Sequence, residues 1–498
     1  IPDQELDVNY FRLLQNMLRD RNGRLVIRPG YDALSATGPG GRIMGLSYFR
    51  TAAGVDRTVA MNRTGWWQFN GTSWVDISGA ALTGGIEDHV RTAVFSVAGT
   101  YKLIGVNGVD SPKIWDGAAA TYSALGGSPP TGMDVAAAAN RLLMLVSPET
   151  IRISEFNDPE TWPAGLVIKL VDAGDLMVGV ERMGRVAVAA YGDHSQWIAR
   201  AQPSSFPFRF DRIDEKPGPV SNAAIVADGS VNYYLADDSN IYRFDGIQVT
   251  PVGAAIRPYI QDNLSFVNRR QTHGLFMQGD RVIYWFFPES TASSPNAGVY
   301  LKLDTGEAGR LLYGVGITAS ARWRYVATVT WDNLTGSWDI IVAAYSTWDS
   351  FGTPAEQRQV LGDVSGQVHG VGIGDGSDDG NAIEGIWELP VRAWAGEANA
   401  FVPDTFETFF RKSANSVTIE PSIGTTNTLM EDRTLTALGN FDISTNQRND
   451  IDLTGAGQGD GVRFSTIRHR VSTTKGGVAW LGGILHGSVT GVEGGPTS

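Results

Sequence analysis

The chain has no cysteine, few charged residues and no long apolar run, and each absence removes a class of function. Without cysteine, its 498 residues can form no disulfide, thiol nucleophile, zinc knuckle or iron–sulfur cluster. No apolar run reaches about 18 residues, so we expect no insertion into a membrane. Charged residues make up only 19% of the chain. A surface with so little charge fits an assembly in which neighbours cover it, or an ordinary β-protein rich in Ser, Thr and Asn outside.

The sequence also lacks the patterns of metal, cofactor and nucleophile sites. The histidines form no His-x-His or His-x-x-x-His pair, so we expect no metal and no cofactor. Asp193-His194-Ser195 contains the residue types of a catalytic triad, but neighbours in a strand or tight turn point apart, and no Gly-x-Ser-x-Gly elbow occurs. We therefore expect no catalytic residue and no enzymatic activity. The six histidines are His89, His194, His273, His369, His469 and His486.

A glycine-rich, acidic stretch has two further interpretations besides a turn. Gly370 to Gly376 resembles part of a dinucleotide loop, but no helical pattern follows it, which favours a β-turn. Asp375, Ser377 and Asp379 resemble the start of a calcium loop. The twelfth position from Asp375 is Ile386, where a glutamate would be needed, so an EF-hand is excluded. A looser calcium site stays open, and a solvated hairpin tip is the simpler expectation.

Tryptophan is abundant, with 14 residues, and motivates a carbohydrate-binding or carbohydrate-cleaving alternative. Cleavage needs two carboxylates about 5–10 Å apart. The 53 acidic residues always allow such pairs, so their number decides nothing. The Ser-x-Asp-x-Gly-x-Thr-Trp box of sialidase blades is missing. The pair Arg269-Arg270 follows a possible helix, and we expect it to be solvated or to meet an acidic partner.

Three segments look like copies of one hairpin, each with an alternating strand, an Asn-Gly or Asp-Gly turn and a second alternating strand. Asn-Gly and Asp-Gly accept the positive φ of a type I′ turn, so each segment predicts a two-residue hairpin. The turns lie at Asn70-Gly71, Asp116-Gly117 and Asp245-Gly246.

The spacing of these turns predicts a β-propeller. Gly71 and Gly117 are 46 residues apart, and Gly117 and Gly246 are 129 apart, which equals three steps of 43. Steps of roughly 40–50 residues fit four-stranded blades. Gly306 and Gly366 follow at intervals of 60 residues, so we expect later blades to be irregular. Three unrelated hairpins in another all-β protein are the alternative.

The pattern along the chain predicts an all-β fold in three parts. Residues 1–42 form an N-terminal segment with a short helix within 3–20 and a strand at Leu25–Pro29. Residues 43–390 form the irregular β-propeller, in which the dense run Arg281–Phe287 is an inner strand buried on both faces and 253–273 contains a helix. Residues 391–498 form a β-sandwich-like domain.

The order of these features resembles the packaged-DNA stabilisation, or tail-nozzle, proteins of short-tailed bacteriophages. The likeness covers nearly the whole chain, and no single stretch is a signature. It rests on Asn16-Met17-Leu18 with Leu25 to Gly30, Val186 to Tyr191 with Ser195-Gln196-Trp197-Ile198, Lys216-Pro217-Gly218 to Ala223 with Ile241 to Ile256, and Gly362-Asp363 with Gly366-Gln367-Val368.

The resemblance implies a structural virion protein, assembled in the host cytoplasm, that forms a homo-oligomeric ring, expected to be a hexamer, at the end of the phage tail. Such a ring continues the DNA channel, retains the packaged genome and passes it during ejection. Its partners would be the tail adaptor protein, tail spikes or fibres, and duplex DNA that passes without tight binding. The net charge of −13 agrees, because tight phosphate binding relies on Lys and Arg. A bacterial scaffold or adhesin propeller is a further alternative.

Overall fold

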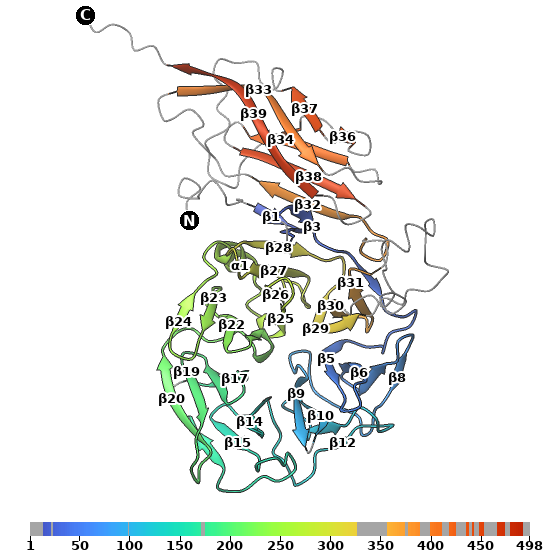
Figure 1. The fold of residues 1–498 in the computed structure, drawn as a ribbon, viewed down its shortest axis with the longest axis vertical. Coiled ribbons are helices and arrows are strands. Elements are labelled where there is room, and N and C mark those ends of the chain that lie inside the picture. Colours follow the sequence, from blue (N-terminus) through green and yellow to red (C-terminus); the bar gives the residue numbers. More distant parts are fainter. Residues whose placement is uncertain are drawn as a thin grey trace, which may run out of the picture.

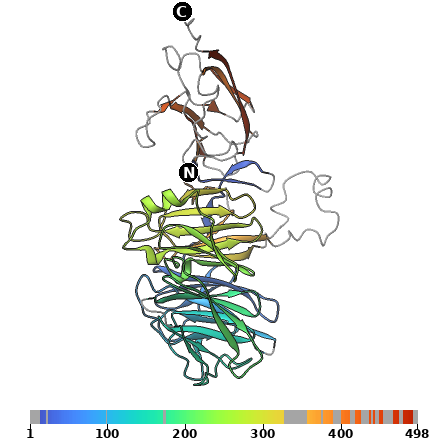
Figure 2. The same ribbon diagram turned by 90° about the vertical axis from the view of Figure 1, so that its left-hand side faces the viewer.

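The computed structural model describes residues 13–20, 23–97, 99–170, 175–325, 356–373 and 377–388, and beyond them the strands β33 to β39. Twenty-eight strands form seven four-stranded antiparallel blades around an axis, so this part of the chain is a seven-bladed β-propeller (Figure 1). A second β-structure extends from the propeller's rim beside blade 6 (Figures 1 and 2). The predicted all-β class, with a propeller and an added β-sandwich-like domain, is confirmed.

Each blade runs from an innermost to an outermost strand. Blade 1 comprises β5 (Ile43–Arg50), β6 (Asp56–Asn62), β7 (Trp66–Phe69) and β8 (Trp74–Asp76), and blade 2 comprises β9 (Arg91–Val97), β10 (Thr100–Val106), β11 (Lys113–Trp115) and β12 (Ser123–Ala124). Blade 3 comprises β13 (Asp134–Ala138), β14 (Arg141–Ser147), β15 (Thr150–Ile153) and β16 (Val167–Lys169), and blade 4 comprises β17 (Met177–Met183), β18 (Ala187–Gly192), β19 (Gln196–Ala201) and β20 (Phe208–Asp214). Blade 5 comprises β21 (Ile225–Asp228), β22 (Val231–Leu235), β23 (Ile241–Phe244) and β24 (Val249–Pro251). Blade 6 comprises β25 (His273–Met277), β26 (Val282–Phe287), β27 (Ala297–Lys302) and β28 (Ala308–Leu312). Blade 7 comprises β29 (Ile317–Tyr325), β30 (Glu356–Asp363), β31 (Val368–Val371) and β4 (Tyr31–Ala33).

The core of the propeller lies between the blades. Seven buried apolar clusters of the described residues each combine side chains from two adjacent blades, including the last and the first. Between blades 1 and 2, for example, the rings of Phe49 and Trp115 meet edge to face with centroids 5.8 Å apart. Because neighbouring blades cover both faces of the inner strands, some of these strands, such as β14 and β26, are nearly continuous apolar runs. The run within Arg281–Phe287 forms β26, which is buried along its whole length as predicted, but it is the second strand of its blade.

The three copied hairpins join the third and fourth strands of blades 1, 2 and 5, so the interval of 129 residues between Gly117 and Gly246 spans three blades. The predicted type I′ turn is wrong. Four residues link the strands in blades 1 and 5, and seven link them in blade 2. In each turn, the side-chain oxygen of Asn70, Asp116 or Asp245 accepts the backbone N–H groups two and three residues later, at 2.7–3.0 Å. The following glycines keep the positive φ that was predicted.

The N-terminal segment forms strands where a helix was predicted. In the described part of the range 3–20, β1 (Leu13–Gln15) and β2 (Met17–Arg19) are extended, and β3 (Leu25–Ile27) follows. Backbone pairing of β1 with the distant β28 and β32, and of β2 with the nearby β3, outweighs the helical spacing of the leucines. The helix expected within 253–273 is present as α1 (Arg257–Asn263), and the described 3-10 turns η2 (Asn222–Ala224) and η3 (Arg269–Gln271) precede β21 and β25.

The second β-structure has two sheets, and the N-terminal segment belongs to both. One sheet continues blade 6 through the order β28-β1-β32-β38-β34-β35, with β36 also on β34. The other has the order β2-β3-β39-β33-β37. The added strands are β32 (Ile383–Glu388), β33 (Asn399–Phe410), β34 (Thr418–Gly424), β35 (Leu435–Ala437), β36 (Phe441–Asp442), β37 (Arg448–Asp452), β38 (Thr466–Thr473) and β39 (Ala479–Gly491). Thus β4, from the predicted segment 1–42, completes blade 7, and β32, from the predicted range 43–390, joins the second β-structure.

Candidate functional site

The Asp193-His194-Ser195 segment does not build a catalytic relay. Ser195 is buried at the turn between β18 and β19, where its hydroxyl donates to the Asp175 carboxylate and accepts the indole N–H of Trp197 at 2.8 Å. The His194 side chain is exposed, and its backbone N–H, at 2.7 Å, is the group that bonds to Asp175. The buried Ser195 hydroxyl bonds to Asp175 and Trp197 and not to the exposed His194, so it has a structural role.

In the acidic loop after β31, Ser377 and Asp378 are buried and Asp379 is exposed, so the solvated hairpin tip expected from the sequence holds for Asp379 and is wrong for Ser377. Asp375 lies outside the described residues. The two carboxylate oxygens of Asp378 accept hydrogen bonds from the Arg28 guanidinium, one of them at 2.8 Å. Asp379 accepts the backbone N–H of Ala33 at 3.0 Å. Both carboxylates bind groups that lie more than 300 residues earlier in the chain, so local sequence gives no hint of these contacts.

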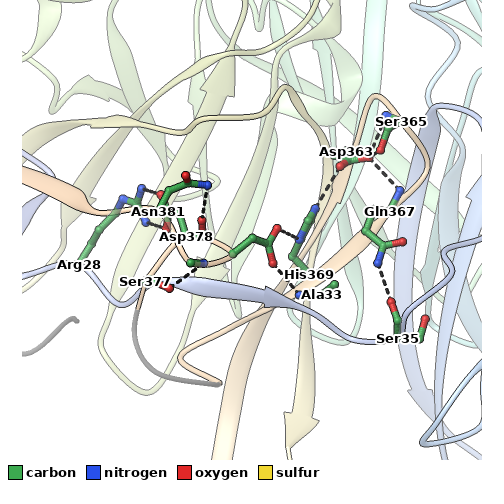
Figure 3. A network of polar contacts seen from close by, with 12 residues as sticks. Arg28, Ala33, Ser35, Asp363, Ser365, Gln367, His369, Ser377, Asp378 and Asn381 are labelled. Carbon is green, nitrogen blue, oxygen red and sulfur yellow. Dashed lines mark hydrogen bonds and ion pairs between the residues drawn. The ribbon is translucent and has the colours of Figure 1, made fainter. Parts of the chain in front are cut away.

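Arg28 joins three parts of the molecule, and Figure 3 shows its contact with Asp378. Besides Asp378, its guanidinium donates to the Leu312 carbonyl oxygen at 2.9 Å and to Asn16 Oδ1 at 3.2 Å, and it lies 4.3 Å from the centre of the Tyr313 ring. Burial alone would lower the pKa of Arg28, but the hydrogen bonds and charge of Asp378 raise it above its ordinary value. The Arg28 guanidinium thus stays charged where β3, β28 and the 377–381 loop meet.

His369 extends these polar contacts of Arg28, Asp378 and Asp379 into blade 7 (Figure 3). Its Nε2 lies 3.1 Å from Asp363 Oδ2 and its Nδ1 lies 3.1 Å from Asp379 Oδ2, while its ring meets the edge of Tyr31 at a centroid distance of 4.9 Å. Burial alone would raise the pKa of Asp363, but hydrogen bonds from His369, Ser365 and Gln367 hold it below its ordinary value. The network fastens β4 to β31, the pairing that closes the propeller ring.

A second polar group lies on the innermost strands. Arg91 of β9 bonds to Asp134 of β13 at 3.0 Å and to Glu181 of β17 at 2.9 Å, which links blades 2, 3 and 4 around the axis. Burial raises the pKa of both carboxyls although Arg91 opposes it. Asp134 is fully buried and also accepts the backbone N–H of Val180 at 3.0 Å. Its carboxylate oxygens are occupied, so the group is built as a brace between blades.

Side chains also cross the axis, at the mouth where the inner strands begin. His89 precedes β9 and His273 begins β25, and their ring centroids are 6.1 Å apart although blades 2 and 6 are not neighbours. Arg42, just before β5, donates from Nη2 to Gln271 Oε1 at 2.5 Å. We call Arg42, His89, Gln271 and His273 the channel-mouth cluster. Its contacts link blades 1, 2 and 6 across the axis.

The remaining sequence candidates have ordinary surroundings. Arg269 pairs with Asp237 at 2.6 Å and lies 4.1 Å from the centre of the exposed Phe266 ring, whereas Arg270 is exposed. Among the described residues, no group of three or more His, Asp or Glu side chains is arranged to hold a metal. Within those same residues, no helix has the length and apolar character needed to cross a bilayer. His469 and His486 lie in β38 and β39.

Comparisons with known proteins assign this chain to no family. No protein-family model matches the chain, and no curated protein matches it. Among solved structures, the chain is similar to U3-55K, with a TM-score of 0.42, 10% identity and coverage of 69% of this chain and 99% of that one. It is also similar to BBS1N in complex with ARL6DN, with a TM-score of 0.41, 11% identity and coverage of 69% and 98%. For Raptor of Chaetomium thermophilum the TM-score is 0.43 at 9% identity, with coverage of 69% and 29%. Similarity at this level says nothing about function.

Proposed function

We propose that this chain is a structural virion protein of a phage tail, one subunit of a nozzle or hub ring that continues the DNA channel, retains the packaged genome and lets it pass during ejection. It would catalyse no reaction. The observation that carries the proposal is the continuous sheet from blade 6 into the second β-structure, which makes a single mechanical unit of two bodies.

The junction between the two bodies is made of backbone pairing. β1 pairs in parallel with β28 and antiparallel with β32, and β3 pairs with β39 in the other sheet. A hinge between the bodies would have to break these hydrogen bonds and expose their polar groups. Such a stiff unit suits a part that bears the load of a packaged genome, and it would be unusual for an enzyme that closes around a substrate.

The DNA path of the proposed ring lies between subunits. Because the channel-mouth cluster links blades 1, 2 and 6 across the propeller's own axis, the proposed lumen is formed by several chains around the duplex. The net charge of −13 supports passage of DNA without tight binding. A chain with this charge would release few counterions on contact with phosphate, so little free energy would favour binding. The proposed partners are further copies of this chain in a hexameric ring, together with the tail adaptor and the spikes or fibres.

The test is the oligomeric state of the purified full chain. We expect light scattering after size exclusion to give a ring of six or more subunits, and negative-stain images to show a central lumen. Binding to duplex DNA should be weak and nearly independent of salt. A chain that stays monomeric at every concentration, alone and with the adaptor, or that grips DNA with a steep salt dependence, would contradict the proposal.

One surface favours the carbohydrate-binding alternative. The tryptophans whose side chains the structure describes are buried or half-buried, so they offer no open stacking platform. Phe156, however, is 53% exposed, and its ring centre lies 5.7 Å from the Arg141 guanidinium in a groove of about 580 Å³ between blades 3 and 4. A glycan array probed with the wild type and Phe156→Ala tests it. Binding that the substitution abolishes would favour this alternative, and no binding would favour the ring.

A further inference from the structure

The dipeptide Asn-Gly is prone to a spontaneous reaction, and the chain contains it three times. Glycine has no side chain to hinder its backbone nitrogen, so this nitrogen can attack the side-chain amide of the asparagine before it. The pairs are Asn22-Gly23, Asn70-Gly71 and Asn107-Gly108. Asn22 lies outside the described residues. The other two pairs have contrasting surroundings, which decide where the folded chain can react.

The pair Asn107-Gly108 is held by hydrogen bonds on both reacting groups. Asn107 is 6% exposed, and its Nδ2 donates to the Thr83 carbonyl oxygen at 3.1 Å and to Asp110 Oδ2 at 2.7 Å. The attacking group is also engaged, since the Gly108 N–H donates to the Gly132 carbonyl oxygen at 2.7 Å. Reaction at this pair would have to break all these hydrogen bonds, which requires local opening of the fold.

The pair Asn70-Gly71 is accessible. Both residues are exposed in the turn between β7 and β8. No group in the described part of the chain accepts the Gly71 N–H, and nothing lies within 4 Å of the place of a Cβ on Gly71. In the equivalent turns of blades 2 and 5, Gly117 and Gly246 are buried against side chains of the preceding blade. Among these three turns, the one in blade 1 therefore offers an open glycine nitrogen.

The cap of this turn activates the amide. Asn70 Oδ1 accepts the backbone N–H groups of Thr72 at 3.0 Å and of Ser73 at 2.9 Å. When the Gly71 nitrogen attacks, negative charge develops on this oxygen, and the two fixed N–H donors stabilise it. The departing Nδ2 donates to the exposed Ser73 hydroxyl at 3.2 Å, a partner that water can replace.

The reaction needs water and no other co-reactant. The Gly71 nitrogen gives its proton to hydroxide and bonds to Asn70 Cγ. The Cγ–Nδ2 bond breaks, Nδ2 takes up a proton from water, and ammonia leaves. Water then opens the resulting cyclic imide at either of its two carbonyl carbons. Each turnover consumes a water molecule and releases ammonia, and no atom changes its oxidation state.

Opening at one carbonyl leaves an aspartate at position 70, a residue that other blades already use at this place. Asp116 Oδ1 and Asp245 Oδ1 each accept the N–H groups two and three residues later, at 2.7–3.0 Å. These hydrogen bonds lower the pKa of Asp116. Burial alone would raise the pKa of Asp245, but the same kind of hydrogen bonds and Arg243 lower it. An aspartate at position 70 therefore keeps the cap and adds a negative charge.

Opening at the other carbonyl leaves isoaspartate, which lengthens the backbone by a carbon and shortens the capping branch. The change falls between Phe69 and Trp74, whose rings flank the turn with centroids 5.2 Å apart. The Phe69 ring also meets the Trp323 ring of blade 7, at a centroid distance of 6.3 Å. Loss of the cap would therefore loosen the packing where the first and last blades meet.

We propose that Asn70 is a site of spontaneous deamidation, at which the folded chain converts to two products of opposite effect. The aspartate product keeps the turn of blade 1. The isoaspartate product weakens the contact between blades 1 and 7. The site does not depend on the ring proposed above.

Incubation of the full-length wild-type chain at neutral and mildly alkaline pH, followed by mass spectrometry of its peptides, tests the site. The reference is the same chain unfolded in guanidinium chloride, in which neither pair is protected. We expect folding to slow the reaction of Asn70 by less than about tenfold and that of Asn107 by more than about a hundredfold. The rate at Asn70 should rise with hydroxide concentration, because the attacking nitrogen must lose its proton.

Two substitutions test the cap. Asn70→Asp keeps an acceptor for Thr72 and Ser73, and its urea midpoint should equal that of the wild type. Asn70→Ala removes the acceptor, and its midpoint should fall. Neither variant can lose an amide at this position, so the negative charge that ion exchange detects in the aged wild type should not appear at this site in either one.

The two products have the same mass and charge, and a protease that cleaves before aspartate but not before isoaspartate distinguishes them. After chromatographic separation, the isoaspartate fraction should unfold at a lower urea concentration than the aspartate fraction. Equal midpoints for the two fractions would overturn the effect assigned to blades 1 and 7. Folding that slows Asn70 as much as Asn107 would overturn the site itself, because the cap would then protect the amide.

Discussion

Blades 5 and 7 attach their outermost strands in opposite ways. In blade 5, β24 follows β23 after four residues, and Asp245 caps the turn by accepting two backbone N–H groups at 3.0 Å. In blade 7, β4 comes from the other end of the chain and pairs with β31. Arg28–Asp378 and Asp379–Ala33 hold it there. A capped turn attaches the outermost strand where the third and fourth strands are neighbours in sequence. A network of polar contacts attaches it where they are not.

The largest expected effect comes from breaking the long-range attachment. Arg28→Met leaves the Asp378 carboxylate buried without its partner, and we expect a loss of about 3–5 kcal/mol in the free energy of unfolding. Urea unfolding, followed by tryptophan fluorescence, measures it. The matched control is Arg281→Met, whose pair with Asp304 is exposed and should contribute less than about 1 kcal/mol. Equal losses from the two substitutions would contradict the role given to Arg28.

The contribution of Asp363 to the stability of blade 7 should depend on pH. Its pKa is held below the ordinary value in the folded state, so the ionised carboxylate stabilises the fold above the unfolded pKa, near 4, and this stabilisation is lost as the pH falls through the folded pKa. We expect Asp363→Asn to destabilise the chain by about 1.5–3 kcal/mol at neutral pH, because the carboxylate accepts several hydrogen bonds. The difference from the wild type should shrink below a pH of about 4. A difference that stays constant with pH would show that ionisation has no part in it.

The smallest effect separates two of the local turns. Gly246 has φ 82°, and an added Cβ would lie 2.8 Å from Ile198 Cδ1 of blade 4. Gly71 has φ 102°, with nothing within 4 Å of such a Cβ. Gly71→Ala should cost about 1–2 kcal/mol from backbone strain alone, and Gly246→Ala should cost more because Ile198 must also move. Thermal unfolding of both variants measures the difference. A larger loss for Gly71→Ala would contradict this account of the turns.

The sequence indicated the propeller because equivalent turns in several blades contain a glycine at the same place. Gly71, Gly117 and Gly246 mark the same turn in blades 1, 2 and 5, and Gly306 marks it in blade 6. Gly366 breaks the series, since it lies between β30 and β31, the second and third strands of blade 7. The interval could not continue there because the fourth strand, β4, is supplied by the N-terminal segment.

The polar clusters could not be predicted, because their members are far apart in the sequence. Arg28 and Asp378 are 350 residues apart, and no local pattern singles out either one. His89 and His273 look like isolated histidines, although each stands where an inner strand begins, four blades apart. The leucines at positions 13, 14 and 18 fit a helix by spacing. Leu13 and Leu14 are extended because they pair with the distant β32, and Leu18 because it pairs with the nearby β3.

Hydrogen exchange of the N-terminal segment tests the central claim, that this segment joins the propeller and the second β-structure into one stiff unit. We expect the backbone amides of β1, β3 and β4 to exchange as slowly as those of β26, which is buried within blade 6. Exchange in these three strands that is orders of magnitude faster than in β26 would mean that the ring opens and the two bodies move independently, and it would contradict the account.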